Sequence, residues 1–449
     1  MPPHPPIHRA AMAWLAGASW LGVAAMTGCD PTSRSRPDPV ATRDSAGIEI
    51  VERIADASTL PRWRLDSVPV LEIGGMSGHA PAEFGRVEAA FRLASGDLVV
   101  ADEQAREIRL FAGDGTHRRT VGRDGEGPGE FRYLFGVERF GGDSLVAWDT
   151  FARRATVFSP EGDLVRSVVL SYPETRWPDG TRGPGWHLET VRPAPGGGWL
   201  SIGRPNAAKP PDLPVPGYYA HPMPVLLHAE DGTIRDTLAT ASGRITTYVP
   251  APVREIDGRP SGSGYQSVIA AGARTGFIDV GDAGFAVAEA VASELRWHSL
   301  DGGLLRIIRI PAAPGVEEYW QRRSESVEQI IERTLDRFRR DPRLASQCDE
   351  PCVRASFDPP YLRDQRPAFS DLALSREGAL WVRQLQVDTA GPVQWLVIGN
   401  DGAARALAEI PHGLTITDIG ESHVVAVRLD TLDVPYVGIW RLRQVSARR

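Results

Sequence analysis

One pattern of apolar and polar positions recurs about six times along the chain. Its first copy has an apolar strand that ends near Arg92, a Ser-Gly-Asp turn at 95–97, and a second strand, Leu98–Asp102, that is apolar up to its final acid. A third strand and an Asp-Gly turn at 114–115 follow. Period-two and short apolar runs between glycine turns indicate β-strands. A unit of this size cannot bury its own faces, so it must pack against copies of itself.

The second strand of each unit is the clearest marker. It occurs at Leu98–Asp102, Leu145–Asp149, Trp199–Gly203, Phe285–Glu289, Leu380–Arg383 and Val424–Arg428. Near both ends of the chain, consecutive markers are separated by the roughly 40–50 residues that a four-stranded blade needs. The pattern therefore predicts an all-β fold, a six-bladed β-propeller.

The middle markers are farther apart, and we interpret the extra residues as insertions. Residues 245–274 are rich in Pro, Gly and Ser and weakly patterned. Residues 312–366 contain a helical stripe, because apolar residues recur there at helical spacing. The stripe consists of Trp320, Val327, Ile331, Leu335 and Phe338. This insertion could cover the central opening, offer a docking surface, or pack on the side of the propeller.

The last repeat predicts how the ring closes. It has three strands, at Leu414–Ile419, His423–Arg428 and Tyr436–Leu442, and lacks a fourth. The apolar segment Val68–Ile73 precedes the first repeat and can supply that outer strand, which removes an exposed sheet edge. We therefore expect residues 47–443 to form one closed propeller.

The N-terminus predicts export. Residues 1–28 have a basic start and an uncharged apolar run at Ala10–Ala25, which is short for a membrane span and typical of a signal peptide. The run ends in Met-Thr-Gly-Cys29, which resembles the lipobox of bacterial lipoproteins, so we expect lipidation of Cys29. An ordinary cleaved signal or an uncleaved anchor are the alternatives. Residues 29–46 are polar and suit a flexible tether. The protein would then be held by lipid in the periplasm or on the outer surface.

The net charge argues against a nucleic-acid partner, and the cysteine spacing indicates a disulfide. With 50 basic and 57 acidic residues, the net charge of −7 offers no polycationic surface for nucleic acid. The remaining cysteines, Cys348 and Cys352, lie four residues apart. In an exported protein they would form a disulfide that fixes a local turn. Two buried thiols are the alternative.

Three segments resemble a known group of proteins. The loop Gly122–Phe131, with the sequence GRDGEGPGEF, is similar to the inter-blade signature of NHL-like six-bladed β-propellers. The segments Asp44–Val51 and Asp430–Leu442 resemble exported propeller lipoproteins of bacteria. This resemblance implies a fold and no particular reaction.

Four acids at or just beyond the ends of second strands are candidate site residues: Asp102, Asp149, Glu289 and Asp430. Equivalent positions around a ring would bring them to one face, where they could bind a cation such as calcium or act as catalytic acids. Alternatively, each carboxylate accepts hydrogen bonds from backbone N–H groups of its own turn, which is the interpretation we favour. No zinc-type histidine spacing and no Gly-x-Ser-x-Gly motif occurs in the sequence.

Four aromatic residues are placed by sequence in Pro/Gly-rich loops: Trp177, Trp186, Tyr218 and Tyr219. They could stack on a sugar or clamp a peptide, or they could fill spaces between blades. Taken together, the sequence favours a monomeric, non-catalytic binding or scaffold protein for a peptide, glycan or protein, without a cofactor. The alternatives are a cation-dependent hydrolase or lyase with its site in the channel, and a structural component of the cell envelope.

Overall fold

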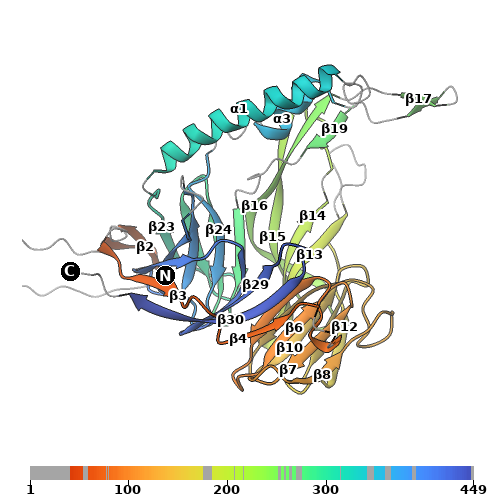
Figure 1. The fold of residues 1–449 in the computed structure, drawn as a ribbon, viewed down its shortest axis with the longest axis vertical. Helices are drawn as coiled ribbons and strands as arrows, with labels where there is room; N and C mark the ends of the chain where they lie inside the picture. Colours follow the sequence, from red (N-terminus) through yellow and green to blue (C-terminus); the bar gives the residue numbers. More distant parts are fainter. Residues whose placement is uncertain are drawn as a thin grey trace, which may run out of the picture. The chain divides into compact units, whose positions relative to one another are not determined.

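The main body of the computed structural model contains six four-stranded antiparallel units, some of which are joined into larger sheets by additional strands (Figure 1). The structure describes residues 41–53, 59–76, 78, 80–174, 185–206, 208–215, 217–250, 254–256, 259–261, 265–268, 276–313, 315–340, 348–358, 366–386 and 391–445. The predicted signal peptide 1–28, with Cys29, lies outside them. The described fold is the predicted six-bladed β-propeller.

Each blade is one sheet whose strands follow one another outward from the channel. Blades 1 to 3 are β5 (Val87–Arg92), β6 (Leu98–Asp102), β7 (Glu107–Phe111), β8 (His117–Val121); β9 (Leu134–Phe140), β10 (Ser144–Asp149), β11 (Arg154–Phe158), β12 (Leu164–Val169); and β13 (Trp186–Pro193), β14 (Trp199–Pro205), β15 (Gly217–His228), β16 (Ile234–Pro250). Blades 4 to 6 are β20 (Gly276–Val280), β21 (Phe285–Glu289), β22 (Glu294–His298), β23 (Leu304–Arg309); β24 (Phe369–Leu374), β25 (Leu380–Gln384), β26 (Val393–Ile398), β27 (Ala404–Ile410); and β28 (Leu414–Ile419), β29 (His423–Leu429), β30 (Pro435–Val445), β4 (Leu71–Gly74).

The core consists of apolar layers between neighbouring blades. One layer joins the facing strands of blades 1 and 2, with Phe131 fully buried in it. Phe131 belongs to the loop 122–131, and its ring lies against Gly122, whose backbone has a φ of +86°. A Cβ at Gly122 would come within 2.6 Å of that ring, so the glycine is required for both its conformation and its close packing. This loop is therefore a structural connection between blades.

The N-terminal segment closes the ring, as the sequence predicted. β4 pairs antiparallel with β30, with Ile73 opposite Val437, and completes blade 6. The segment also does more than the sequence indicated. β2 (Ile48–Arg53) adds to blade 4 in parallel with β23, and β3 (Arg62–Leu65) pairs with both β27 and β30. The strands β2, β3 and β4 thus form a belt along the outer edges of blades 4, 5 and 6, which covers strand edges that would otherwise be exposed.

The first strand of this region corrects part of the predicted tether. β1 (Ala41–Ser45) lies inside the segment 29–46 that we expected to be flexible, and it pairs antiparallel with β2. All five of its residues are exposed, so it adds a hairpin and buries little apolar surface. The rest of the tether, residues 29–40, lies outside the described residues.

The described residues of the insertion form two helices where the sequence indicated one. α1 (Val316–Arg340) buries Trp320, Ile331 and Leu335, three members of the predicted stripe. α3 (Glu350–Phe357) packs between α1 and the extended end of β16. Both helices lie beside the long hairpin of β15 and β16 in Figure 1. No described helix is long and apolar enough to cross a membrane.

The second predicted insertion is partly regular structure. Residues 245–250, which the sequence marked as weakly patterned, continue β16, and β19 (Tyr265–Val268) pairs with them. β17 (Arg254–Ile256) and β18 (Arg259–Ser261) form a separate hairpin. Short 3-10 turns occur at Ala80–Ala82 and Pro195–Gly197.

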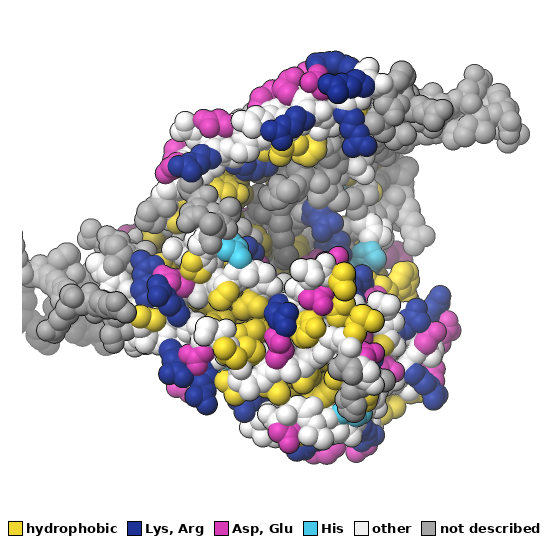
Figure 2. Space-filling model, in the orientation of Figure 1, with side chains coloured by type: hydrophobic (Ala, Val, Ile, Leu, Met, Phe, Trp, Pro, Cys, Tyr) yellow, Lys and Arg dark blue, Asp and Glu magenta, His cyan; other side chains and the backbone are white. Residues whose placement is uncertain are grey.

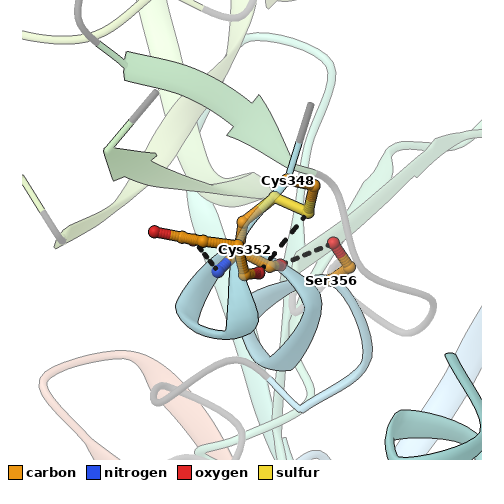
Figure 3. The surroundings of a disulfide bond; sticks show 4 residues. Cys348, Cys352 and Ser356 are labelled. Atoms are coloured by element: carbon orange, nitrogen blue, oxygen red, sulfur yellow. Dashed lines mark hydrogen bonds between the residues drawn. A yellow bond between two sulfur atoms is a disulfide. The ribbon is translucent and has the colours of Figure 1, made fainter. Parts of the chain in front are cut away.

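A disulfide joins Cys348 to Cys352 across the start of α3 (Figure 3). Asp349 is the N-cap of this helix, and its side chain accepts a hydrogen bond from the backbone N–H of Cys352 at 3.0 Å. Such a cap satisfies one of the free N–H groups of the first turn. The disulfide and the cap therefore fix the same turn, and Cys352 is buried against β16.

Candidate functional site

The channel wall carries one acid from each of the six innermost strands. In chain order they are Glu88, Glu138, Glu189, Asp279, Asp371 and Asp418, and each of them lines a cavity in the channel. Sequence reasoning missed this set, because we examined the acids of the second strands. The available signal was one acid in each strand that precedes a marker turn.

β-Bulges occur in five of the six innermost strands. An extra residue interrupts the pairing of β5, β9, β13, β24 and β28 with the second strand of its blade, whereas β20 pairs regularly. A bulge turns a side chain away from its normal face of the sheet. Four of the extra residues, Glu88, Phe135, Glu189 and Thr417, line the larger cavity.

The channel has a wide end and a narrow end. The wide end is a cavity of about 590 Å³, lined by residues such as Glu88, Arg383 and His412 near the beginnings of innermost strands or the ends of second strands. The narrow end is a cavity of about 190 Å³ at the turns where innermost strands end, beside Arg192 and Arg376. The two share Asp279, Leu374, Thr417 and Asp418, so they are continuous.

Arg192 of β13 links blades 2, 3 and 4 at the narrow end. Its guanidinium donates to the backbone carbonyl of Val280 and, at 3.2 Å, to that of Arg139. It also donates to the carboxylate of Asp282 at 2.6 Å and lies 3.3 Å from that of Glu138. Only 8% of Arg192 is exposed, so these partners replace water around its charge.

Arg376 links blades 5, 6 and 1 in the same way. Its guanidinium binds the carboxylate of Asp418, with an Nε–Oδ1 distance of 3.0 Å, and donates to the carbonyl of Arg92. The carboxylate of Asp418 also accepts the backbone N–H of Arg92 at 3.0 Å.

Two further acids join the remaining blades. Asp279 accepts the N–H of Leu374 at 2.7 Å, which connects blade 4 to blade 5. Asp143 accepts the N–H of Ala94 at 2.7 Å, which connects blade 2 to blade 1. With the two arginines, these contacts span every interface between neighbouring blades. We call Arg192, Arg376, Asp279, Asp418 and Asp143 the polar ring. Its hydrogen bonds and ion pairs hold neighbouring blades together, which is a structural role.

Burial changes the titration of two acids at this end. Desolvation raises the pKa of Glu138 to about 7, although the nearby Arg192 opposes the shift. Desolvation likewise raises the pKa of Asp279 to about 6, against the backbone hydrogen bonds from Leu374 and Val280. Near neutral pH, a proton on Glu138 is therefore exchanged with little cost.

The wide end differs because several of its polar side chains are not hydrogen-bonded. The side chains of Glu88, Arg383 and His412 make no hydrogen bond or ion pair with any other described residue, and all three residues line the larger cavity. Glu189 is paired, with its carboxylate 2.5 Å from Arg204. Desolvation also raises the pKa of Glu88, partly offset by Arg86.

Arg383 lies in a row of three side chains across blade 5. It is directly opposite Asp371 on β24 and directly opposite Trp395 on β26, so the three share one face of the sheet. All three line the wide cavity, together with Leu414 at the start of blade 6. This face therefore presents a guanidinium between an acid and an aromatic wall.

The helical insertion is attached to the face with the wide opening. Trp320 of α1 packs against Ile245 of β16 and Leu385, the residue after β25. Its indole N–H donates to the carbonyl of Pro367, just before β24, at 3.2 Å. These contacts lie where β24 begins and β25 ends, which is the wide side of blade 5. Figure 2 shows a recess between the insertion and the propeller body.

The acids predicted from the second strands accept backbone N–H groups, within their own blades except for Glu289, whose donor belongs to blade 3. Asp102 accepts the N–H groups of Gly85, Arg86 and Ala105. The other three accept backbone N–H groups as well: Asp149 from Arg132, Tyr133 and Ala152, Glu289 from Ser242, and Asp430 from Leu432 and Val434. Asp102, Asp149 and Glu289 occupy equivalent positions opposite the beginnings of β5, β9 and β20. Their carboxylates are engaged in fixing the chain.

The predicted aromatic residues are not gathered at the channel. Trp177 lies outside the described residues. Trp186 begins β13, and Tyr218 and Tyr219 lie in β15, so these three are in strands and not in the loops that we expected. Tyr219 packs edge-on against His221, with ring centroids 5.0 Å apart. None of the three lines the described cavities.

Among the described residues, no group of three or more His, Cys, Asp or Glu side chains is arranged to hold a metal ion. Four of the channel acids, Glu138, Glu189, Asp279 and Asp418, are bound by arginines or backbone N–H groups.

Comparison with known proteins finds structural neighbours of low sequence identity. No protein-family model and no curated protein sequence matches the chain. Among solved structures, a putative exported protein from Bacteroides fragilis is 11% identical, with a TM-score of 0.43 over 86% of this chain and 100% of that one. A member of the DUF4221 family from Bacteroides vulgatus is 8% identical, with a TM-score of 0.45 over 86% and 100%. A gluconolactonase from Xanthomonas campestris is 12% identical, with a TM-score of 0.36 over 85% and 97%.

Proposed function

We propose that this protein is a non-catalytic binding protein of the cell envelope that holds a small ligand at the wide end of its channel. The observation that carries the proposal is the contrast between the two ends. At the narrow end, the polar ring uses its charges to fasten the blades. At the wide end, Glu88, Arg383 and His412 line a cavity of about 590 Å³, and their side chains make no hydrogen bond or ion pair with another described residue. Cavities of about 300–1,000 Å³ with a few polar groups are typical ligand sites.

The alternative function, a cation-dependent hydrolase or lyase, has less support from these contacts. The carboxylates Asp102 and Asp149 are occupied by backbone N–H groups, and Asp418 is bound by Arg376. A divalent cation would need several free oxygen ligands at one point.

The cellular setting is part of the proposal. The apolar run Ala10–Ala25 and the lipobox-like sequence before Cys29 support export and lipid anchoring. The loop 122–131, packed between two blades through Phe131, supports a relationship to NHL-like propellers.

A cavity-filling variant tests the binding function. Thr415 is an exposed residue that lines the wide cavity, so T415W should block it. Amino acids, short peptides and sugars are screened by thermal shift, because a ligand that binds the native state raises the melting temperature. V165W, on the exposed outer strand of blade 2, is the matched control. We expect a compound that stabilises the wild type and V165W and leaves T415W unchanged. If every stabilising compound acts equally on T415W, the cavity is not the binding site.

A further inference from the structure

We propose that the wide end of the channel recognises a zwitterion, a free amino acid or short peptide whose carboxylate binds Arg383 and whose ammonium group binds Glu88. This inference rests on the proposed function and specifies its ligand class.

The first step is that two opposite charges face one cavity without pairing to each other. Glu88 belongs to blade 1 and Arg383 to blade 5, and both line the wide cavity. Neither makes a hydrogen bond or ion pair with another described residue. The other arginines that line the two cavities are engaged: Arg192 with Asp282, Arg376 with Asp418 and Arg139 with Asp143 at 3.9 Å. A separated pair of free charges complements a ligand that carries both signs.

The second step concerns Arg383. Its neighbour across the strands, Asp371, accepts the backbone N–H of Leu372 at 2.9 Å through Oδ1, and the side chain of Arg383 makes no hydrogen bond or ion pair with another described residue. The planar guanidinium is therefore available, and its fork of N–H donors matches a carboxylate in bidentate geometry.

The third step concerns Glu88. The bulge in β5 turns it out of the regular pairing, so that its side chain contributes to the cavity wall. Desolvation raises its pKa, and an ammonium group brought into the cavity would favour the ionised carboxylate again. A bound cation would thus offset the free-energy cost of desolvating the ionised Glu88 carboxylate.

The fourth step is that apolar side chains also line this cavity. Phe277, Leu372 and Leu414 line the same cavity, and Trp395 forms part of the wall beside Arg383. Apolar side chains of a ligand would be removed from water there, while its two charged ends meet opposite walls. A volume of about 590 Å³ is within the range for ligands of this size.

The test uses one dipeptide in three forms. Ala-Phe with free ends, its N-acetyl form and its C-terminal amide are titrated into the full chain by calorimetry at pH 7. The acetyl group removes the ammonium charge and the amide removes the carboxylate. We expect each cap to weaken binding by at least about tenfold, the loss typical of a charge-assisted contact.

Variants assign each loss to its residue. R383M should bind the free dipeptide no better than the wild type binds the amide, and E88Q should no longer distinguish the acetylated form. R118M and E126Q, two exposed positions outside the cavity, are the controls. Equal binding of the capped and free forms, or unchanged discrimination by R383M and E88Q, would overturn the inference.

The outcome also separates this inference from the proposed function. If an uncharged probe binds the wild type and T415W abolishes that binding, the cavity is a ligand site and the zwitterion inference is wrong. If no dipeptide or screened compound binds in a T415W-sensitive manner, both are wrong.

Discussion

Replacing Arg192 with methionine removes a charge that fastens three blades. Arg192 is 8% exposed and satisfies two backbone carbonyls and two carboxylates, so methionine leaves all four without their donor. Removing one partner of a buried charged pair typically costs about 3–5 kcal/mol in the free energy of unfolding. We expect R192M to lose about that amount in urea denaturation at pH 8.

The pH dependence of this loss identifies its cause. At pH 5, Glu138 already carries a proton, because burial raises its pKa to about 7. R192M should therefore destabilise the protein less at pH 5 than at pH 8. The double variant R192M/E138Q should recover about 1–2 kcal/mol at pH 8, since no uncompensated carboxylate remains at that position.

The matched control is an exposed arginine. Arg119 pairs with Asp163 at 2.8 Å, and their side chains are 46% and 70% exposed. R119M should cost less than about 1 kcal/mol, as is usual for a surface ion pair. If R192M costs no more than R119M, or costs the same at both pH values, the polar ring does not fasten the blades in the manner described.

Three further predictions concern stability. E138Q should flatten the pH dependence of the unfolding free energy. Between about pH 4.5 and about 7, the folded protein keeps a proton on Glu138 that the unfolded chain releases, so the unfolding free energy of the wild type falls as the pH rises, by at most about 1.4 kcal/mol per pH unit. An unchanged slope in E138Q would contradict this assignment. C348S/C352S should lose about 2 kcal/mol or less and increase hydrogen exchange in α3 alone, whereas increased exchange throughout the blades would refute a local role. I73D places a charge at Ile73, which is 9% exposed in the closing strand, and should lower the unfolding free energy by about 3–5 kcal/mol. V70D, at a 58%-exposed site, should cost less than about 1 kcal/mol. Similar losses for the two variants in urea denaturation would argue against closure by this strand.

The sequence determined the features that depend on local pattern. Apolar strands with glycine turns set the blade as the repeating unit, and a last repeat with three strands required an outer strand from elsewhere. Val68–Ile73 was the available candidate, and the pairing of Ile73 with Val437 confirms it. The apolar stripe of α1 could also be predicted, because the spacing of apolar residues along a helix is visible in the sequence.

Other features required the tertiary structure. The belt places β2 beside β23, where Glu49 is paired with Arg306 some 257 residues later, and no local pattern encodes that parallel neighbour. The bulges of β5 and β13 decide which residues face the channel, and a shift of one residue reverses the face of a side chain.

The candidate site belongs to this second class for the same physical reason. Innermost strands face a polar channel, so their inward positions carry no hydrophobic period to mark them. Glu88 and Arg383 are ordinary charged residues in the sequence, and they become a site only because closure of the ring brings blades 1 and 5 to one cavity. Hydrophobic periodicity and turn residues can be identified within a short stretch of sequence. The position of a charged side chain relative to the channel depends on how the blades assemble into a ring.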